Sequence, residues 1–205
     1  NRRKEMEYMM PENPWIDTRL NEEEMNFLWQ IISEENKQNW NHHLAGNISK
    51  SELIKDKDNW FYESALKKLT ERMFYRNWDN FSKYHVMIEE EEEVPLPEFK
   101  MNTFWVNYQK QHEFNPPHNH QGLFSFVIFM KIPTHWEKQH ALPISANSRS
   151  PHASDFIFLL GQGNGDVVLA PFFLSPEDEG RMLFFPAKLQ HMVFPFYECE
   201  EERVT

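Results

Sequence analysis

The chain has almost no cysteine, since Cys199 is the only one among 205 residues. A single cysteine excludes an intrachain disulfide, and it excludes a structural zinc site built from several cysteines. Because disulfide-free chains are typical of reducing compartments, we expect an intracellular, cytoplasmic protein. The first five residues include basic side chains with no apolar segment after them, so we expect no signal peptide.

Long apolar runs and an excess of basic residues are missing as well. No stretch approaches the roughly 20 apolar residues that a membrane-spanning helix needs, so we expect no membrane span. The formal net charge is −11. This charge disfavours tight, non-specific binding to nucleic acid, which depends on Lys and Arg at the phosphates. We expect a small-molecule or peptide substrate instead.

The remaining composition suits a folded protein. Hydrophobic residues make up 40% of the chain and aromatic residues 15%, and the length favours one domain with a substantial core. We therefore expect a single domain over residues 1–205, with a mainly helical part at 1–88 and a β-rich part at 100–205. An acidic run at 89–93 separates them and is expected to be a solvated loop or strand edge.

Helical signals are confined to the first part. Asn21 and Glu24 have the spacing of a capping box, and apolar residues at helical spacing follow them. A second amphipathic helix is predicted from about Asn59 to about Trp78.

Strand signals dominate beyond Lys100. The predicted strands lie at 103–109, 124–132, 155–160, 167–174, 181–185, 192–196 and 203–205. Short strands at this density favour a sandwich or jelly roll. Helices first and strands afterwards indicate a mainly β protein of the α+β class, in which helices brace one face of the sandwich.

Two histidines one residue apart, His118 and His120, stand just before an apolar run. In an extended strand, residues i and i+2 point to the same face, so both imidazoles can aim at one point. A third histidine, His191, follows an apolar strand that ends at Pro186, and it is predicted to open a new strand. Together the three could form a three-nitrogen site for iron or another first-row transition metal. By spacing alone, two edge-strand histidines in a turn are the favoured interpretation, because short His-x-His patterns also arise by chance.

The other seven histidines lie in polar or loop-like contexts, and we expect them to be ordinary surface or hydrogen-bonding groups. They are His42, His43, His85, His112, His135, His140 and His152. Asp155 and Glu113 are candidates for a carboxylate ligand, although nothing in their spacing supports either.

Arg203 and Thr205 face the same way if the chain is extended there. A guanidinium and a hydroxyl on one face can receive a carboxylate, because Arg binds carboxylates in a bidentate manner. The competing interpretation is that Arg203 pairs with an acidic neighbour at 200–202.

The ordered combination of His118-x-His120, the segment 180–186, His191 and Arg203-x-Thr205 resembles the iron(II)- and 2-oxoglutarate-dependent oxygenases. The resemblance is closest to an uncharacterised bacterial and phage branch, whose first motif reads approximately His-x-His-Pro-Gly before a Ser-Gly strand. Here Gln121 replaces that proline and Phe126 the strand glycine. The resemblance covers about residues 104–205.

This resemblance implies a double-stranded β-helix (jelly roll, cupin-like) braced by helices, and a dioxygenase that uses Fe(II), 2-oxoglutarate and O2. It implies three iron ligands, namely His118, His120 and His191. Arg203 and Thr205 would hold the distal carboxylate of 2-oxoglutarate, and Tyr108 would contact the co-substrate. Since the chain stops within a predicted strand, we expect the family's last strand to continue beyond Thr205.

One departure keeps other functions open. His120 stands where most of these oxygenases carry Asp or Glu. The leading hypothesis is a hydroxylase of unidentified substrate. The alternatives are a cupin-like three-histidine metal enzyme that does not use 2-oxoglutarate, and a non-catalytic jelly-roll binding protein. The helical first half could be a substrate platform, a homodimer surface or a brace.

Aromatic residues are frequent near the proposed ligands. These residues are Phe104, Trp105, Phe124, Phe126, Phe184 and Phe185. They could line a dry pocket around the metal, or they could simply fill the core.

Overall fold

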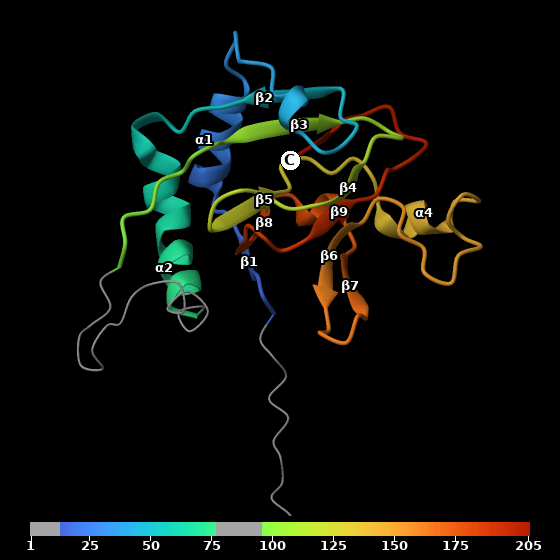
Figure 1. Cartoon of the computed structure of the whole chain (residues 1–205). Coiled ribbons are helices and arrows are strands. Elements are labelled where there is room, and N and C mark those ends of the chain that lie inside the picture. Colours follow the sequence, from blue (N-terminus) through green and yellow to red (C-terminus); the bar gives the residue numbers. More distant parts are fainter. Residues whose placement is uncertain (1–12, 77–95) are drawn as a thin grey trace, which may run out of the picture.

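The computed structural model describes residues 13–76 and 96–205. Within them the helices of the first part of the chain lie against one side of a set of antiparallel sheets, and the short helix α4 (Trp136–Ala141) lies on the opposite side (Figure 1). The first twelve residues, His85, the acidic run at 89–93 and the expected helix end at Trp78 lie outside the described residues. Among the described helices, none has the length and apolar character needed to cross a lipid bilayer.

The first helix, α1 (Glu22–Ile32), begins where the capping signal predicts. The side chain of Asn21 accepts from the backbone N–H of Glu24, and the Glu24 carboxylate accepts from the backbone N–H of Asn21, both at 2.9 Å. These two bonds satisfy donors that a helix start leaves without intrahelical partners. The second helix, α2 (Lys67–Arg76), continues from a π-helical turn at Tyr62–Leu66.

The strands of the described residues form three antiparallel sheets. The first has the order β1-β8-β5, built from Ile16–Arg19, Arg181–Pro186 and Phe124–Ile128. The second has the order β10-β3-β2, built from Arg203–Val204, Trp105–Gln109 and Lys50–Leu53. The third has the order β4-β9-β6-β7, built from Asn115–His118, His191–Val193, Phe156–Gly161 and Val167–Phe172.

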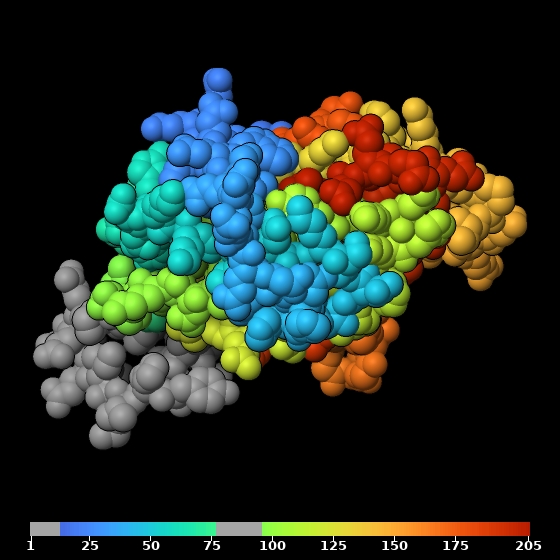
Figure 2. Space-filling view, turned by 90° about the horizontal axis from the view of Figure 1, so that it is seen from above, coloured from blue at the N-terminus to red at the C-terminus, as the bar shows by residue number. Residues whose placement is uncertain are grey.

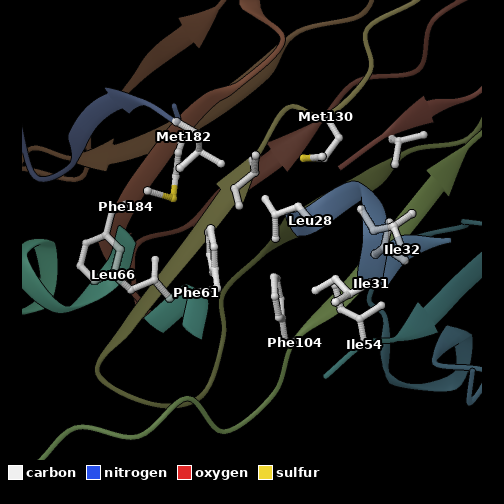
Figure 3. Packing of buried hydrophobic residues seen from close by; sticks show 14 of the residues in the cluster. Leu28, Ile31, Ile32, Ile54, Phe61, Leu66, Phe104, Met130, Met182 and Phe184 are labelled. Carbon is white, nitrogen blue, oxygen red and sulfur yellow. The ribbon is translucent and has the colours of Figure 1, made fainter. Parts of the chain in front are cut away.

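The alternation of side chains along β8 sets the layers. Met182 and Phe184 belong to a core cluster shared with α1 and α2, whereas Leu183 and Phe185 belong to a second cluster shared with β6 and β7. Because neighbouring residues of a strand face opposite ways, the sheet that contains β8 lies between the helices and the third sheet. The helices therefore brace one face of a sandwich, as the sequence predicts. Figure 3 shows the helix-side cluster, where Leu28 and Ile31 of α1 lie near Phe61 and Phe104.

The apolar run at 124–132 is not one uninterrupted strand. Strand β5 ends at Ile128, and the backbone then changes partners: Met130 donates to the carbonyl of Val204, and Lys131 and Val204 bond to each other. This exchange joins the first sheet to the second. In the view from above, the cyan residues of the first part of the chain lie against the green region that contains β3 (Figure 2).

Several short elements carry no strong sequence signal and were not predicted. They are β1, β2, β4 and the helix α4 (Trp136–Ala141). Strand β4 contains two prolines, which normally argue against a strand. The prolines are tolerated here because only the two end residues of β4, Asn115 and His118, pair with β9, so the prolines need not donate to the ladder.

Candidate metal centre and adjoining pocket

Three histidines converge although they come from distant parts of the chain. His118 ends β4 and pairs directly with His191, the first residue of β9. The sequence predicts that His118 and His120 share one strand. In the structure β4 ends at His118, so His120 lies beyond it. Its position is set instead by a backbone N–H bond to the carbonyl of Ala187, at 2.8 Å. One ring nitrogen of each of the three histidines lies within 4.8 Å of the others.

Backbone carbonyls fix the orientation of two of these rings. The Nδ1 of His118 lies 2.8 Å from the carbonyl oxygen of Pro116, and the Nδ1 of His191 lies 3.0 Å from that of Leu189. Because a carbonyl only accepts, each Nδ1 must carry the proton and donate it. The lone pair of each ring therefore lies on Nε2. Hydrogen bonds of this kind orient metal-binding imidazoles in known metal sites.

The surroundings of the cluster favour uncharged imidazoles. Burial lowers the pKa of His118, lowers that of His120 to about 4 and lowers that of His191 to about 3. Apolar rings cause part of this burial: Phe156 stacks on His191 with centroids 5.6 Å apart, and Phe185 meets it edge-on at 5.0 Å. All three rings are thus neutral near pH 7, which is the form that binds metal.

The cluster fits a transition-metal ion. The Nε2 atoms of His120 and His191 are 3.2 Å apart. Two ligands at neighbouring positions of an octahedral ion, each about 2.1 Å from the metal, lie about 3.0 Å apart. Imidazole is a common ligand for iron, zinc, copper and nickel. Within the described residues this is the only group of three His, Cys, Asp or Glu side chains arranged closely enough to hold an ion.

No carboxylate joins the three histidines within the described residues. Asp155 is instead held by His140 and His152, each at 2.9 Å. Glu113 accepts from the backbone N–H groups of Ser49 and Lys110. Both carboxylates considered from the sequence are therefore engaged elsewhere.

A small pocket lies beside the histidines. Phe156, which stacks on His191, contributes to its wall, as does Val193, two residues beyond His191 on β9. The full lining is Ile48, Asn107, Gln109, Asn115, Val127, Phe129, Phe156, Val193, Arg203 and Thr205. The wall is thus polar at Arg203 and Gln109 and apolar at Phe156 and Val193, and Asn115 of β4 adds a further polar group.

Arg203 is a buried cation with unused hydrogen-bonding capacity. Its side chain is 1% exposed, and burial lowers its pKa to about 10, so it still carries a charge at neutral pH. Its Nη2 donates to Ser154, and its Nη1 lies 3.4 Å from the side-chain oxygen of Gln109. Its Nε is buried and has no partner. A buried donor without an acceptor costs free energy, so an anion in this pocket would be stabilised.

The acidic neighbours of Arg203 do not pair with it. Glu201 forms an ion pair with Lys131 at 2.8 Å, and Glu200 accepts from Gln111. The interpretation that Arg203 is neutralised by its own acidic run is therefore wrong.

Tyr108 is not among the residues that line the pocket, so the contact with the co-substrate that the resemblance implied stays a prediction. It packs with Val106 and Val204 against the helix-side core, and Lys50 lies 4.1 Å above its ring. Burial and a hydrogen bond with Glu52 raise the pKa of Tyr108 to about 12. The pocket is lined instead by its strand neighbours Asn107 and Gln109. The alternating pattern of β3 indicates two faces, but it does not say which one meets Arg203.

Of the six aromatic residues near the motif, two lie beside the histidines and four help to fill the helix-side core. Phe185 contacts His191 and Trp105 lies 5.5 Å from His120. The other four belong to or pack against the helix-side core: Phe104, Phe124, Phe126 and Phe184. Ser154, which sequence reasoning did not single out, contacts Arg203 directly.

Comparisons with known proteins agree with this arrangement. A family model described as "Putative 2OG-Fe(II) oxygenase" matches residues 103–205. The structure is similar to a crystal structure of a Pseudomonas putida prolyl-4-hydroxylase, with a TM-score of 0.51 and 14% sequence identity over 94% of this chain and 89% of that one. At this identity the likeness concerns the fold alone, which is a double-stranded β-helix. Among curated proteins no sequence matches this chain.

Proposed function

We propose that this chain, which belongs to the 2OG-Fe(II) oxygenase family and is therefore an Fe(II)- and 2-oxoglutarate-dependent dioxygenase, hydroxylates a small molecule or a peptide. We assign the iron ligands to His118, His120 and His191, and the anchor of the co-substrate to Arg203 and Thr205. One observation carries the assignment. A cluster of three neutral imidazoles adjoins a pocket that contains a buried arginine with an unpaired N–H.

The iron would bind to imidazoles that are already in their ligand form. Burial keeps the rings neutral, so no proton must leave them near pH 7. The carbonyls of Pro116 and Leu189 hold two of the rings in the tautomer that exposes Nε2. When bound, Fe(II) with 2-oxoglutarate and O2 supplies the oxidising chemistry that turns the co-substrate into succinate and CO2 and inserts oxygen into a C–H bond.

The pocket supports the binding of a dicarboxylic 2-oxo acid. Arg203 offers a charged donor at its polar end, and Thr205 offers a hydroxyl on the same face of the extended chain. At the other end, Phe156, which stacks on His191, and Val193 form an apolar part of the wall. A co-substrate that spans the pocket would thus present its distal carboxylate to Arg203 and its 2-oxo end to the iron.

We also propose that the helical part and the β part form one domain. The helix-side core contains Leu28 and Ile31 of α1 together with Val106 of β3 and Met182 of β8. Such shared packing makes the helices a brace for the sheets.

The test is turnover of 2-oxoglutarate to succinate by the purified protein with Fe(II) and ascorbate, together with its metal content. We expect turnover, one bound iron per chain, and a change in the absorption of the bound metal when 2-oxoglutarate is added. Tight metal binding with no effect of 2-oxoglutarate on that absorption would point to the cupin-like alternative. That alternative has one observation in its favour, the absence of a carboxylate among the three grouped residues.

A further inference from the structure

Ser154 adopts a backbone conformation that is unusual for its residue type. It immediately precedes Asp155 and strand β6, is 0% exposed, and has a φ of 77°. Residues with a Cβ rarely adopt positive φ, and glycine takes this conformation most easily. Its backbone N–H donates to the carbonyl of Pro195 at 2.8 Å. The turn is thus held in place by the backbone, and serine occupies a position that glycine could fill with less strain.

The hydroxyl of Ser154 accepts a hydrogen bond from Arg203, which a glycine at this position could not do. The Nη2 of Arg203 donates to the carbonyl oxygen of Ser154 at 2.9 Å and to its Oγ at 2.5 Å. The same Oγ lies 3.2 Å from the hydroxyl of Thr134, so it can accept from Arg203 while it donates to Thr134. One residue therefore supplies both acceptors of one guanidinium nitrogen.

Asp155, the residue that follows Ser154, also holds the turn in place. Its carboxylate is fully buried, and its two oxygens accept separately from His140 and His152, each at 2.9 Å. Its backbone carbonyl accepts from the N–H of Phe194. With all three acceptors in use, the segment that carries Ser154 has little freedom to rotate.

Gln109 holds the second terminal nitrogen of the guanidinium. Its Nε2 donates to the backbone carbonyl of Glu113 at 2.6 Å, which turns its Oε1 toward Nη1 of Arg203 at 3.4 Å. The guanidinium is thus restrained at both terminal nitrogens, more closely at Nη2, while Nε keeps an unpaired N–H. Because the fork is planar, restraint at two corners fixes the direction of the third.

We propose that Ser154 is a positioning residue for the co-substrate: by accepting from Nη2 with both of its oxygens, it orients the Arg203 guanidinium toward the distal carboxylate of a 2-oxo dicarboxylic acid. This inference rests on the proposed function. It adds a residue that does not touch the co-substrate but determines how well Arg203 binds it.

The test compares Ser154→Ala and Ser154→Gly with the unmodified protein. Both variants lose the hydroxyl, and Ser154→Gly also relieves the positive φ, so it stays folded if Ser154→Ala does not. Loss of a hydrogen bond to a charged group typically weakens binding by about tenfold or more. We expect both variants to raise KM and Kd for 2-oxoglutarate by at least about tenfold, with kcat at saturating co-substrate and metal content unchanged.

Pyruvate separates positioning from general damage, because it is a 2-oxo acid without the distal carboxylate. Binding of each acid is measured by calorimetry on the metal-loaded protein without oxygen. The substitutions should weaken binding of 2-oxoglutarate and leave that of pyruvate unchanged. Thr70→Val serves as the matched control, because it removes a buried hydroxyl of α2 that donates to the carbonyl of Leu66 in the preceding π-helical turn and is not bonded to Arg203.

Three outcomes would overturn the inference. If both Ser154 variants bind 2-oxoglutarate as tightly as the unmodified protein, Ser154 does not position Arg203, and the proposed function stands. Equal loss of 2-oxoglutarate and pyruvate binding would indicate a disturbed site rather than a misoriented anchor. If the unmodified metal-loaded protein binds no 2-oxoglutarate, the proposed co-substrate is wrong and the inference fails with it.

Discussion

His120 and His191 bring their Nε2 atoms to 3.2 Å from each other, although they are 71 positions apart in the chain. Because His191 donates through Nδ1, its Nε2 carries a lone pair, and in the metal-free protein a neutral His120 can fill this contact by donating from its own Nε2. A metal ion would use both lone pairs at once. The same 3.2 Å separation therefore serves a hydrogen bond in the metal-free protein and two neighbouring ligands of one ion when metal is bound.

Removal of a histidine from this cluster should remove the metal. We expect His118→Ala and His191→Ala each to lower iron affinity by more than the roughly 10- to 100-fold that loss of an outer-shell partner causes. Metal content by elemental analysis, with a competing chelator, provides the measurement. His42→Ala is the control, because His42 is exposed and lies outside the cluster. Unchanged metal content in both cluster variants would contradict every enzymatic interpretation given above.

Replacement of Arg203 should separate co-substrate binding from metal binding. Truncation of one partner of a buried charge pair typically costs about 2–5 kcal/mol. We expect Arg203→Ala to weaken 2-oxoglutarate binding by an amount in this range while iron content is retained. Because Arg203 is almost fully buried, Arg203→Lys should be compared, since it keeps the charge and loses the planar fork. Tight 2-oxoglutarate binding by both variants would place the anchor elsewhere.

The parts of the fold that could be predicted depend on signals within a few residues of one another. The capping pair Asn21 and Glu24 locates the start of α1 because both bonds span three residues. The glycine-rich segment at 161–166 likewise predicts the turn between β6 and β7. By contrast, β1 pairs with β8 over more than 160 positions, and its four residues carry no periodicity of their own.

The site shows the same division between local and long-range information. The three histidines were predicted as a group, and the structure brings them together. The surroundings of Arg203 were not predicted. The choice between Tyr108 and its neighbours depends on which face of the sheet carries the Arg203 side chain. Arg203 stands opposite Gln109 in the pairing of β10 with β3, and a two-residue period alone does not reveal that register. Ser154 contacts Arg203 through a positive φ that no sequence pattern indicated.

Acid should destabilise the metal-free protein through its buried histidines. Burial lowers the pKa of His120 to about 4 and that of His191 to about 3, whereas an unfolded histidine titrates near 6.5. Below about pH 6.5 the unfolded chain therefore binds protons that the folded chain does not, and stability falls with pH until the folded pKa values are reached. Chemical unfolding of chelator-treated protein at several pH values should show this fall. It should be smaller in His191→Ala, and equal slopes in the two proteins would contradict the prediction.

Gly46 should be intolerant of a side chain because of its contact with the pocket wall. A Cβ at this position would lie 1.8 Å from the side-chain oxygen of Asn115 and 2.5 Å from the backbone oxygen of Phe114. Asn115 lines the pocket and begins β4, the strand that ends at His118. Overpacking of this kind typically costs about 1–3 kcal/mol, so we expect Gly46→Ala to lower the free energy of unfolding by this amount and to weaken 2-oxoglutarate binding.

Gly161→Ala is the matched control for this substitution. A Cβ at Gly161 would meet no atom within 4 Å, and the residue has no positive φ. The free energy of unfolding and the Kd for 2-oxoglutarate should therefore be unchanged in Gly161→Ala and altered in Gly46→Ala. If Gly46→Ala loses stability but binds 2-oxoglutarate normally, Asn115 can move without consequence for the co-substrate. The polar end of the pocket would then depend on Arg203 and its direct neighbours rather than on the loop that packs against β4.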